Sequence, residues 1–110
     1  MIAKSKLWIE RKDGVLVLSD WRVDLLERIE QTGSLTQAAR EMDVPYRTAC
    51  YKLKQVECNL GVKLLEMHSG RSKGGSSRLS IAGRDYLEKY RDFREGFDQV
   101  VTERFKEIFE

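Results

Sequence analysis

The most informative segment of this chain runs from Ser34 to Asn59 and has the sequence SLTQAAREMDVPYRTACYKLKQVECN. Two short helical patterns meet there at a break around Asp43 and Pro45. Asp tolerates left-handed backbone better than most residues, and Pro suits the first turn of a helix because no amide donor is needed there. A bracing helix, a tight turn and a second helix are typical of a helix-turn-helix, whose second helix enters the major groove of DNA.

The second helix, predicted from Pro45 to about Asn59, has two distinct faces. Taking Leu53 as the inward reference at 100° per residue, the residues within about 60° of it are Ala49, Cys50, Val56 and Leu60. The opposite face carries Arg47, Thr48, Tyr51, Lys54 and Gln55, without a carboxylate. An ordinary solvated face is the alternative, but such faces usually include Asp or Glu. We therefore predict that Arg47, Thr48 and Tyr51 contact base edges.

The helices before this one show clear start and stop signals. Asp20 is predicted to cap a helix from Trp21 to Gln31, and Gly33 to end it. Ser34 is the expected N-cap of the next helix, with Gln37 at the capping-box position. The expected inward residues are Trp21, Leu25, Leu26 and Ile29 in the first helix and Leu35, Ala38, Ala39 and Met42 in the second.

Two hairpins are predicted on either side of these helices. The first covers Lys6–Ser19 and turns at Asp13-Gly14. The second pairs residues 63–67 with residues 78–81 across a loop of three glycines, four serines and two cations. A structureless linker is the alternative for this loop, but the flanking strand patterns favour a wing that follows the sugar-phosphate backbone. The expected DNA-backbone contacts are Ser34, Thr36, Lys54, Arg71, Lys73 and Arg78, and Tyr46 is also expected to bind DNA.

One long helix is predicted from Ala82 to Glu110, with an apolar stripe at helical spacing. We expect the stripe to pack against a second copy, because one small head cannot cover its whole length. Its expected interface residues are Tyr86, Tyr90, Phe93, Phe97, Val101 and Phe105. Gly96 lies within this helix, where it marks a close crossing or a bend.

Composition limits the possible functions. The 110 residues fit one domain, 1–110, divided into a DNA-binding head over 1–81 and a dimerisation helix over 82–110. Residues 1–84 hold 15 Lys and Arg against 10 Asp and Glu, whereas residues 85–110 hold 5 against 8. The positive charge thus lies with the predicted DNA-binding segment. With no membrane segment or signal peptide in the pattern, we expect a cytoplasmic protein.

Catalytic and metal sites are not expected. Cys50, Cys58 and His68 match no common zinc spacing, and the two cysteines diverge on one helix. The diglycine at Gly74 lacks the ending of a nucleotide-binding loop, and no nucleophile–base pair stands out. We predict neither an enzyme nor a bound cofactor.

The segment from Gln31 to Tyr90 resembles the DNA-binding domain of the molybdate-responsive ModE family. The shared signals are Thr-Gly-Ser at 32–34, Gln-Ala-Ala at 37–39, Tyr46, Gly-x-x-Lys-Gly-Gly at 70–75 and Leu-Ser-x-x-Gly at 79–83. The chain is similar, more distantly, to LysR-type regulators over residues 60–66. Cys50 and Asp43 stand where the ModE family often has Trp and a nearby Gly. The resemblance implies DNA binding and dimerisation. Because molybdate sensors of the family carry further domains after the long helix, we expect no molybdate response from this chain.

Together these patterns predict a mainly α protein with small β elements: a winged helix-turn-helix with an N-terminal β-hairpin and a long C-terminal dimerisation helix. The expected function is sequence-specific binding of double-stranded DNA by a homodimer that regulates transcription. A winged-helix module for protein–protein interaction is the alternative, since the same exposed face can bind protein.

Overall fold

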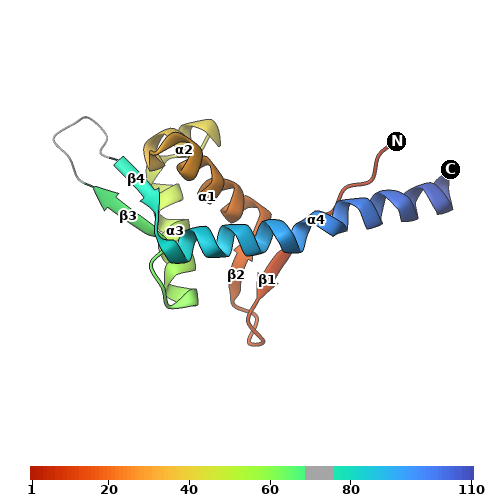
Figure 1. Cartoon of the computed structure of the whole chain (residues 1–110), viewed down its shortest axis with the longest axis horizontal. Helices are drawn as coiled ribbons and strands as arrows, with labels where there is room; N and C mark the ends of the chain where they lie inside the picture. Colours follow the sequence, from red (N-terminus) through yellow and green to blue (C-terminus); the bar gives the residue numbers. More distant parts are fainter. Residues whose placement is uncertain (69–75) are drawn as a thin grey trace.

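The computed structural model describes residues 1–68 and 76–110, in which small antiparallel strand pairs flank a mostly helical head (Figure 1). The elements follow in the order β1 (Trp8–Glu10), β2 (Leu16–Ser19), α1 (Asp20–Thr32), α2 (Leu35–Glu41), α3 (Tyr46–Leu60), β3 (Leu65–His68), β4 (Ser76–Leu79) and α4 (Ile81–Phe109). This architecture confirms the predicted winged helix-turn-helix with an N-terminal hairpin and a long last helix. Within the described ranges, none of the helices combines the length and apolar character that crossing a bilayer requires.

The core of the head lies among α1, α2, α3 and the start of α4. Leu25, Ile29, Ala38 and Ala49 are fully buried, and Leu87 brings α4 into the same cluster. Burying aliphatic side chains of this size contributes about 1.5–3 kcal/mol each relative to exposure. Because Leu87 and Tyr90 belong to this core, the head does not end at residue 81 as expected but includes the first part of α4.

The helix-turn-helix forms as the local signals predicted. Ser34 caps α2, its Oγ accepting from the Gln37 amide at 3.1 Å, and Gly33 ends α1 at a φ of 72°. Asp43 takes the left-handed conformation in the turn, with a φ of 55°. Pro45 lies one position outside its predicted place, as the N-cap of α3 rather than its first residue.

The N-terminal hairpin pairs β1 with β2 in antiparallel register, with an irregularity between Ile9 and Glu10. Gly14, at a φ of 88°, lies in its turn, and its amide donates to the Arg11 carbonyl at 2.9 Å. Asn59 at the end of α3 donates from Nδ2 to the Leu16 carbonyl at 2.8 Å. The hairpin is therefore fastened to the base of α3.

Asp20 does not cap α1, contrary to the prediction. Ser19 is the N-cap, its Oγ accepting from the Arg22 amide at 3.2 Å. The Asp20 carboxylate instead accepts hydrogen bonds from the Leu7 amide and the Tyr90 hydroxyl, and Arg94 Nε lies 3.2 Å from it. This residue thus joins the N-terminal segment, α1 and α4 at one point.

The second hairpin is shifted relative to its predicted bounds. β3 and β4 pair from Leu65 opposite Leu79 to His68 opposite Ser76. Ile81 was expected in the second strand, but Ser80 caps α4, so that Ile81 is the first residue of the helix. The Ser80 hydroxyl oxygen accepts a hydrogen bond from the Gly83 amide in the first turn of α4, so the strand ends before this residue.

Gly83 lets the first turn of α4 approach the chain before β3. A Cβ at this position would lie 2.3 Å from the Leu64 carbonyl oxygen. Ser80 adds two hydrogen bonds here, since its Oγ accepts from the Gly83 amide at 3.0 Å and donates to the Lys63 carbonyl at 2.6 Å. The Leu-Ser-x-x-Gly pattern at 79–83 is therefore a packing motif that fixes α4 on the head.

Candidate nucleic-acid interface

The exposed face of α3 has the composition predicted from the sequence. Arg47, Tyr51 and Lys54 are exposed, and Thr48 and Gln55 are half-buried. Gln55 Nε2 donates to the Tyr51 hydroxyl at 3.1 Å, one helical turn away. This contact, which spacing alone did not single out, orients the phenol while its own proton remains available to donate.

The only acidic residue of α3, Glu57, is hydrogen-bonded to the chain that leads into β3. Glu57 Oε2 accepts hydrogen bonds from the Leu64 amide at 2.7 Å and the Leu65 amide at 3.3 Å. Its negative charge is thus committed to the chain that leads into β3. The exposed face is left with cations and neutral hydrogen-bonding groups, the set that suits phosphates and base edges.

Three further residues predicted to bind DNA lie at the starts of α2 and α3. Ser34 and Thr36 are half-buried at the start of α2, and Tyr46, at the start of α3, is partly exposed. The Ser34 Oγ accepts from an amide but keeps a proton that it can donate to a phosphate.

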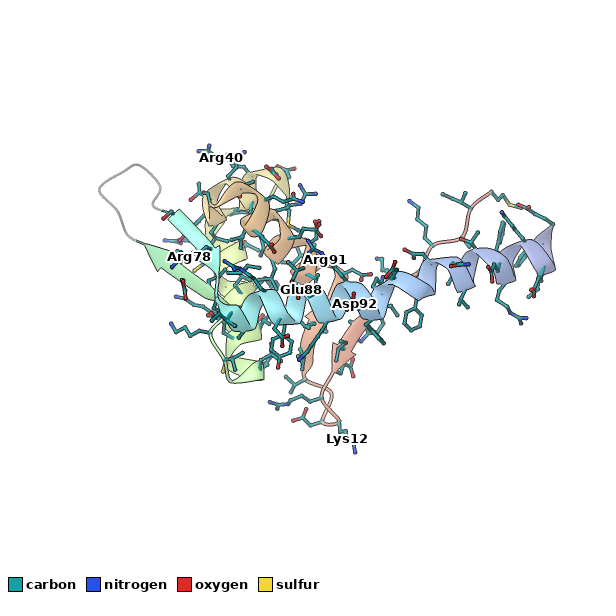
Figure 2. The ribbon with its side chains drawn as sticks, viewed as in Figure 1. Lys12, Arg40, Arg78, Glu88, Arg91 and Asp92 are labelled. Atoms are coloured by element: carbon teal, nitrogen blue, oxygen red, sulfur yellow. The ribbon has the colours of Figure 1, made fainter. Side chains whose placement is uncertain are left out.

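The two strands of the wing, β3 and β4, carry one of the predicted backbone contacts among the residues that the structure describes. Arg78 on β4 is exposed and is paired through Nε with Glu66 Oε2 at 2.8 Å, a contact that sequence analysis did not foresee (Figure 2). Exposed pairs of this kind contribute about 0–1 kcal/mol, so that a phosphate can displace Glu66 at little cost. The other two predicted wing contacts, Arg71 and Lys73, lie outside the described residues.

The predicted interface residues of α4 separate into two groups. Tyr90 is 4% exposed inside the head, where its hydroxyl donates to Asp20, and Tyr86 packs partly buried against the core. Tyr90 is therefore a core residue, and its assignment to a dimer interface is wrong. Phe93 and Phe97 are partly exposed and pack edge to face at 5.1 Å between ring centroids, and Phe105 stacks on Phe109 at 5.2 Å.

The cluster around Asp20 is electrostatically coupled. Burial acts to raise the pKa of Asp20, but hydrogen bonds from Tyr90 and Leu7, with the charge of Arg94, outweigh it and lower that pKa. Burial and the adjacent carboxylate raise the pKa of Tyr90, which therefore stays protonated as a donor. Arg94 also donates to the Ser5 carbonyl at 2.7 Å. This cluster joins the N-terminal segment, α1 and α4.

Residues 1–68 and 76–110 contain no group of three or more His, Cys, Asp or Glu side chains placed to hold a metal ion. Cys50 is half-buried and Cys58 exposed, and both are free thiols.

Comparison with known proteins finds a family model and two curated relatives that match this chain. A family model for the bacterial regulatory helix-turn-helix proteins of the lysR family matches residues 22–84. The chain is 30% identical over 95 residues to the molybdenum transport protein ModE of Azotobacter vinelandii, and 33% identical over 75 residues to the transcriptional regulator ModE of Haemophilus influenzae. These alignments cover 83% and 68% of this chain but 35% and 29% of the relatives, so the chain spans about a third of their length.

Two solved structures of protein–DNA complexes share the fold of this chain. A crystal structure of a CbnR_DBD–DNA complex superposes with a TM-score of 0.58 at 26% identity, covering 73% of this chain and 86% of that one. The BenM_DBD structure, in complex with benA site 1 DNA, superposes with a TM-score of 0.62 over 78% of this chain and 94% of that one. At 17% identity the second match shows the fold alone. With the family model matching more than half of its length, this chain belongs to the LysR family of bacterial regulatory helix-turn-helix proteins.

Proposed function

We propose that this chain binds double-stranded DNA sequence-specifically as a homodimer and regulates transcription, with α3 as the recognition helix. The observation that carries the proposal is the exposed face of α3, where Arg47, Tyr51 and Lys54 lie without a competing carboxylate because Glu57 is bonded to the wing. Two supporting facts are membership of a regulatory helix-turn-helix family and the likeness to DNA-binding domains solved with DNA.

The proposed roles follow from position on the head. Arg47, Thr48 and Tyr51 contact base edges, since recognition helices read bases mainly with their N-terminal residues. The remaining proposed contacts are to phosphates and sugars, which fix the register of the protein on the duplex. They are Ser34, Thr36, Tyr46, Lys54 and Arg78, with Arg71 and Lys73 included on sequence grounds.

The proposed dimer forms through the part of α4 that leaves the head. Phe93, Phe97, Val101 and Phe105 carry the stripe that a second copy covers, together with the exposed Val100, Ile108 and Phe109. A symmetric pair of heads would bind two half-sites about one turn of DNA apart. Because its target is bacterial DNA, we propose that the protein acts in the cytoplasm.

Salt-dependent binding tests the DNA proposal directly. The purified chain is titrated into a labelled random-sequence duplex at several salt concentrations, and the slope of log K against log salt is measured. We expect a slope of about −0.9 for each neutralised phosphate. Lys12 is the control, because it lies at the tip of the N-terminal hairpin, away from the wing (Figure 2), and Lys12→Ala should leave the slope unchanged. Absent or salt-independent binding would favour the protein-interaction alternative.

The absence of a molybdate response stays a prediction for this chain. An oxyanion needs several converging donors in a preformed pocket. Calorimetric titration with molybdate, with sulfate as the matched anion, should give no saturable heat.

A further inference from the structure

A crease runs between α3 and the wing, beside the exposed face of the recognition helix. Its cavity has a volume of about 250 Å³. The walls come from Tyr46, Cys50 and Lys54 on α3 and from Lys63, Leu65 and Met67 on the strand side, with Leu35, Leu53 and Glu57 completing the lining. We call this feature the helix–wing crease.

Lys63 enters the crease from a fixed backbone. Its carbonyl accepts from the Ser80 Oγ at 2.6 Å, and the next amide, that of Leu64, donates to Glu57 Oε2 at 2.7 Å. The chain at Lys63 is thus fastened to both α3 and the start of α4, while its side chain remains exposed. The backbone at Lys63 is therefore fixed relative to α3, and from it the flexible side chain can reach into the crease.

The chemistry of the crease suits a sugar-phosphate chain. Lys54 from α3 and Lys63 from the strand side both line the crease, and the one carboxylate in the lining, that of Glu57, accepts hydrogen bonds from amides. The floor and ends are apolar or aromatic, with Met67 53% and Tyr46 44% exposed. Cations above an apolar floor complement an anionic backbone with deoxyribose between its charges.

The position of the crease fits the same occupant. With α3 in the major groove and the wing over the neighbouring minor groove, the strand that separates the grooves must cross the surface between them. We propose that the helix–wing crease seats the sugar-phosphate backbone of one DNA strand, with Lys63 as a phosphate contact opposite Lys54. This proposal rests on the proposed function and adds Lys63 and the crease to it.

Two cysteines on α3 provide a test inside the unmodified chain. Cys50 lines the crease, whereas Cys58 lies exposed two helical turns further along α3. Alkylation of each thiol by iodoacetamide is followed by mass spectrometry, with and without a saturating random-sequence duplex. We expect the duplex to slow alkylation of Cys50 several-fold and to leave that of Cys58 nearly unchanged. A Cys50 rate unaffected by bound duplex, or equal slowing of both thiols, would overturn the proposal.

A charge variant gives a second, independent readout. Lys63→Met keeps the aliphatic stem and should lower affinity for all sequences alike, with a salt slope shallower by about one unit. Lys63→Arg should retain the slope, and Lys12→Met is the matched control on the hairpin. Unchanged affinity and slope for Lys63→Met, while the unmodified chain binds DNA normally, would refute the crease alone. Failure of the unmodified chain to bind duplex would instead refute the proposed function.

Discussion

The two halves of α4 meet different surroundings, although one continuous helix carries both. Near its start, Leu87 is 0% and Tyr90 4% exposed in the core of the head. Near its end, Ile108 is 63% and Phe109 67% exposed. In Figure 1 the first half of α4 lies against the head, whereas the second half extends well beyond it. Nothing in the local sequence separates the halves, since aromatic residues recur at helical spacing in both.

This contrast shows that the same apolar stripe can pack in the core of a head or remain exposed for a partner. Beside the head, the stripe supplies core packing and hydrogen bonds to Asp20. Beyond the head, the same pattern leaves large side chains in solvent, a costly arrangement unless a partner covers them. The first half of α4 therefore stabilises the monomer, and we infer that the second half is retained for association.

Charging the outer stripe should produce the largest effect. In Phe97→Asp with Val101→Asp, two carboxylates per chain would be buried at the dimer seam, and each unpaired buried ion costs several kcal/mol. We expect sedimentation to show monomers whose heads remain folded. Gln99→Asp with Lys106→Gln changes the net charge equally at positions off the stripe and should leave the dimer intact. An unmodified chain that sediments as a monomer at micromolar concentration would contradict the assignment.

The two glycines of α4 should respond in opposite ways to substitution by alanine. Gly83→Ala places a Cβ 2.3 Å from the Leu64 carbonyl and should destabilise the head by about 3 kcal/mol through overpacking. Gly96→Ala meets nothing within 4 Å and should stabilise the helix by about 1 kcal/mol. Urea unfolding of both variants measures these opposite signs. If Gly96→Ala instead weakened the dimer, the two helices would cross closely at that glycine.

Acid should weaken the head through Asp20 by a smaller amount. The pKa of Asp20 is lowered in the folded state, so its contribution is complete above the unfolded value of about 3.9 and is lost as the pH falls through the folded value. Because this side chain is 37% exposed, Asp20→Asn should cost only about 1 kcal/mol at neutral pH. The unfolding free energies of the two proteins should converge as the pH falls below the unfolded value of about 3.9. A constant difference across that range would exclude this role for the carboxylate.

Sequence alone predicted the helix-turn-helix because its signals are local. Ser34, Gly33 and Asp43 act within a few residues of their own positions, through a cap, a left-handed end and a tight turn. The exposed face of α3 could be found for the same reason, since helical periodicity fixes which residues share a side.

The errors came from long-range contacts. Asp is a residue type that often caps helices, but the Asp20 carboxylate accepts a hydrogen bond from Tyr90, 70 residues away. Ser19 caps the helix instead. The same contact places Tyr90 in the core, which periodicity cannot distinguish from a dimer seam. Glu57 and Lys63 were missed because their roles depend on how the wing packs against α3, which no spacing in the sequence reveals.

Selection from random duplexes by the unmodified chain and by Arg47→Ala tests whether α3 reads DNA. Arg47 projects from the first turn of α3, and its loss should cost about 1–3 kcal/mol and erase the preference at one position in each half-site. We expect a two-fold symmetric site for the unmodified chain and a blurred position for the variant. An identical site recovered with Arg47→Ala, at full affinity, would show that α3 is not the helix that reads DNA.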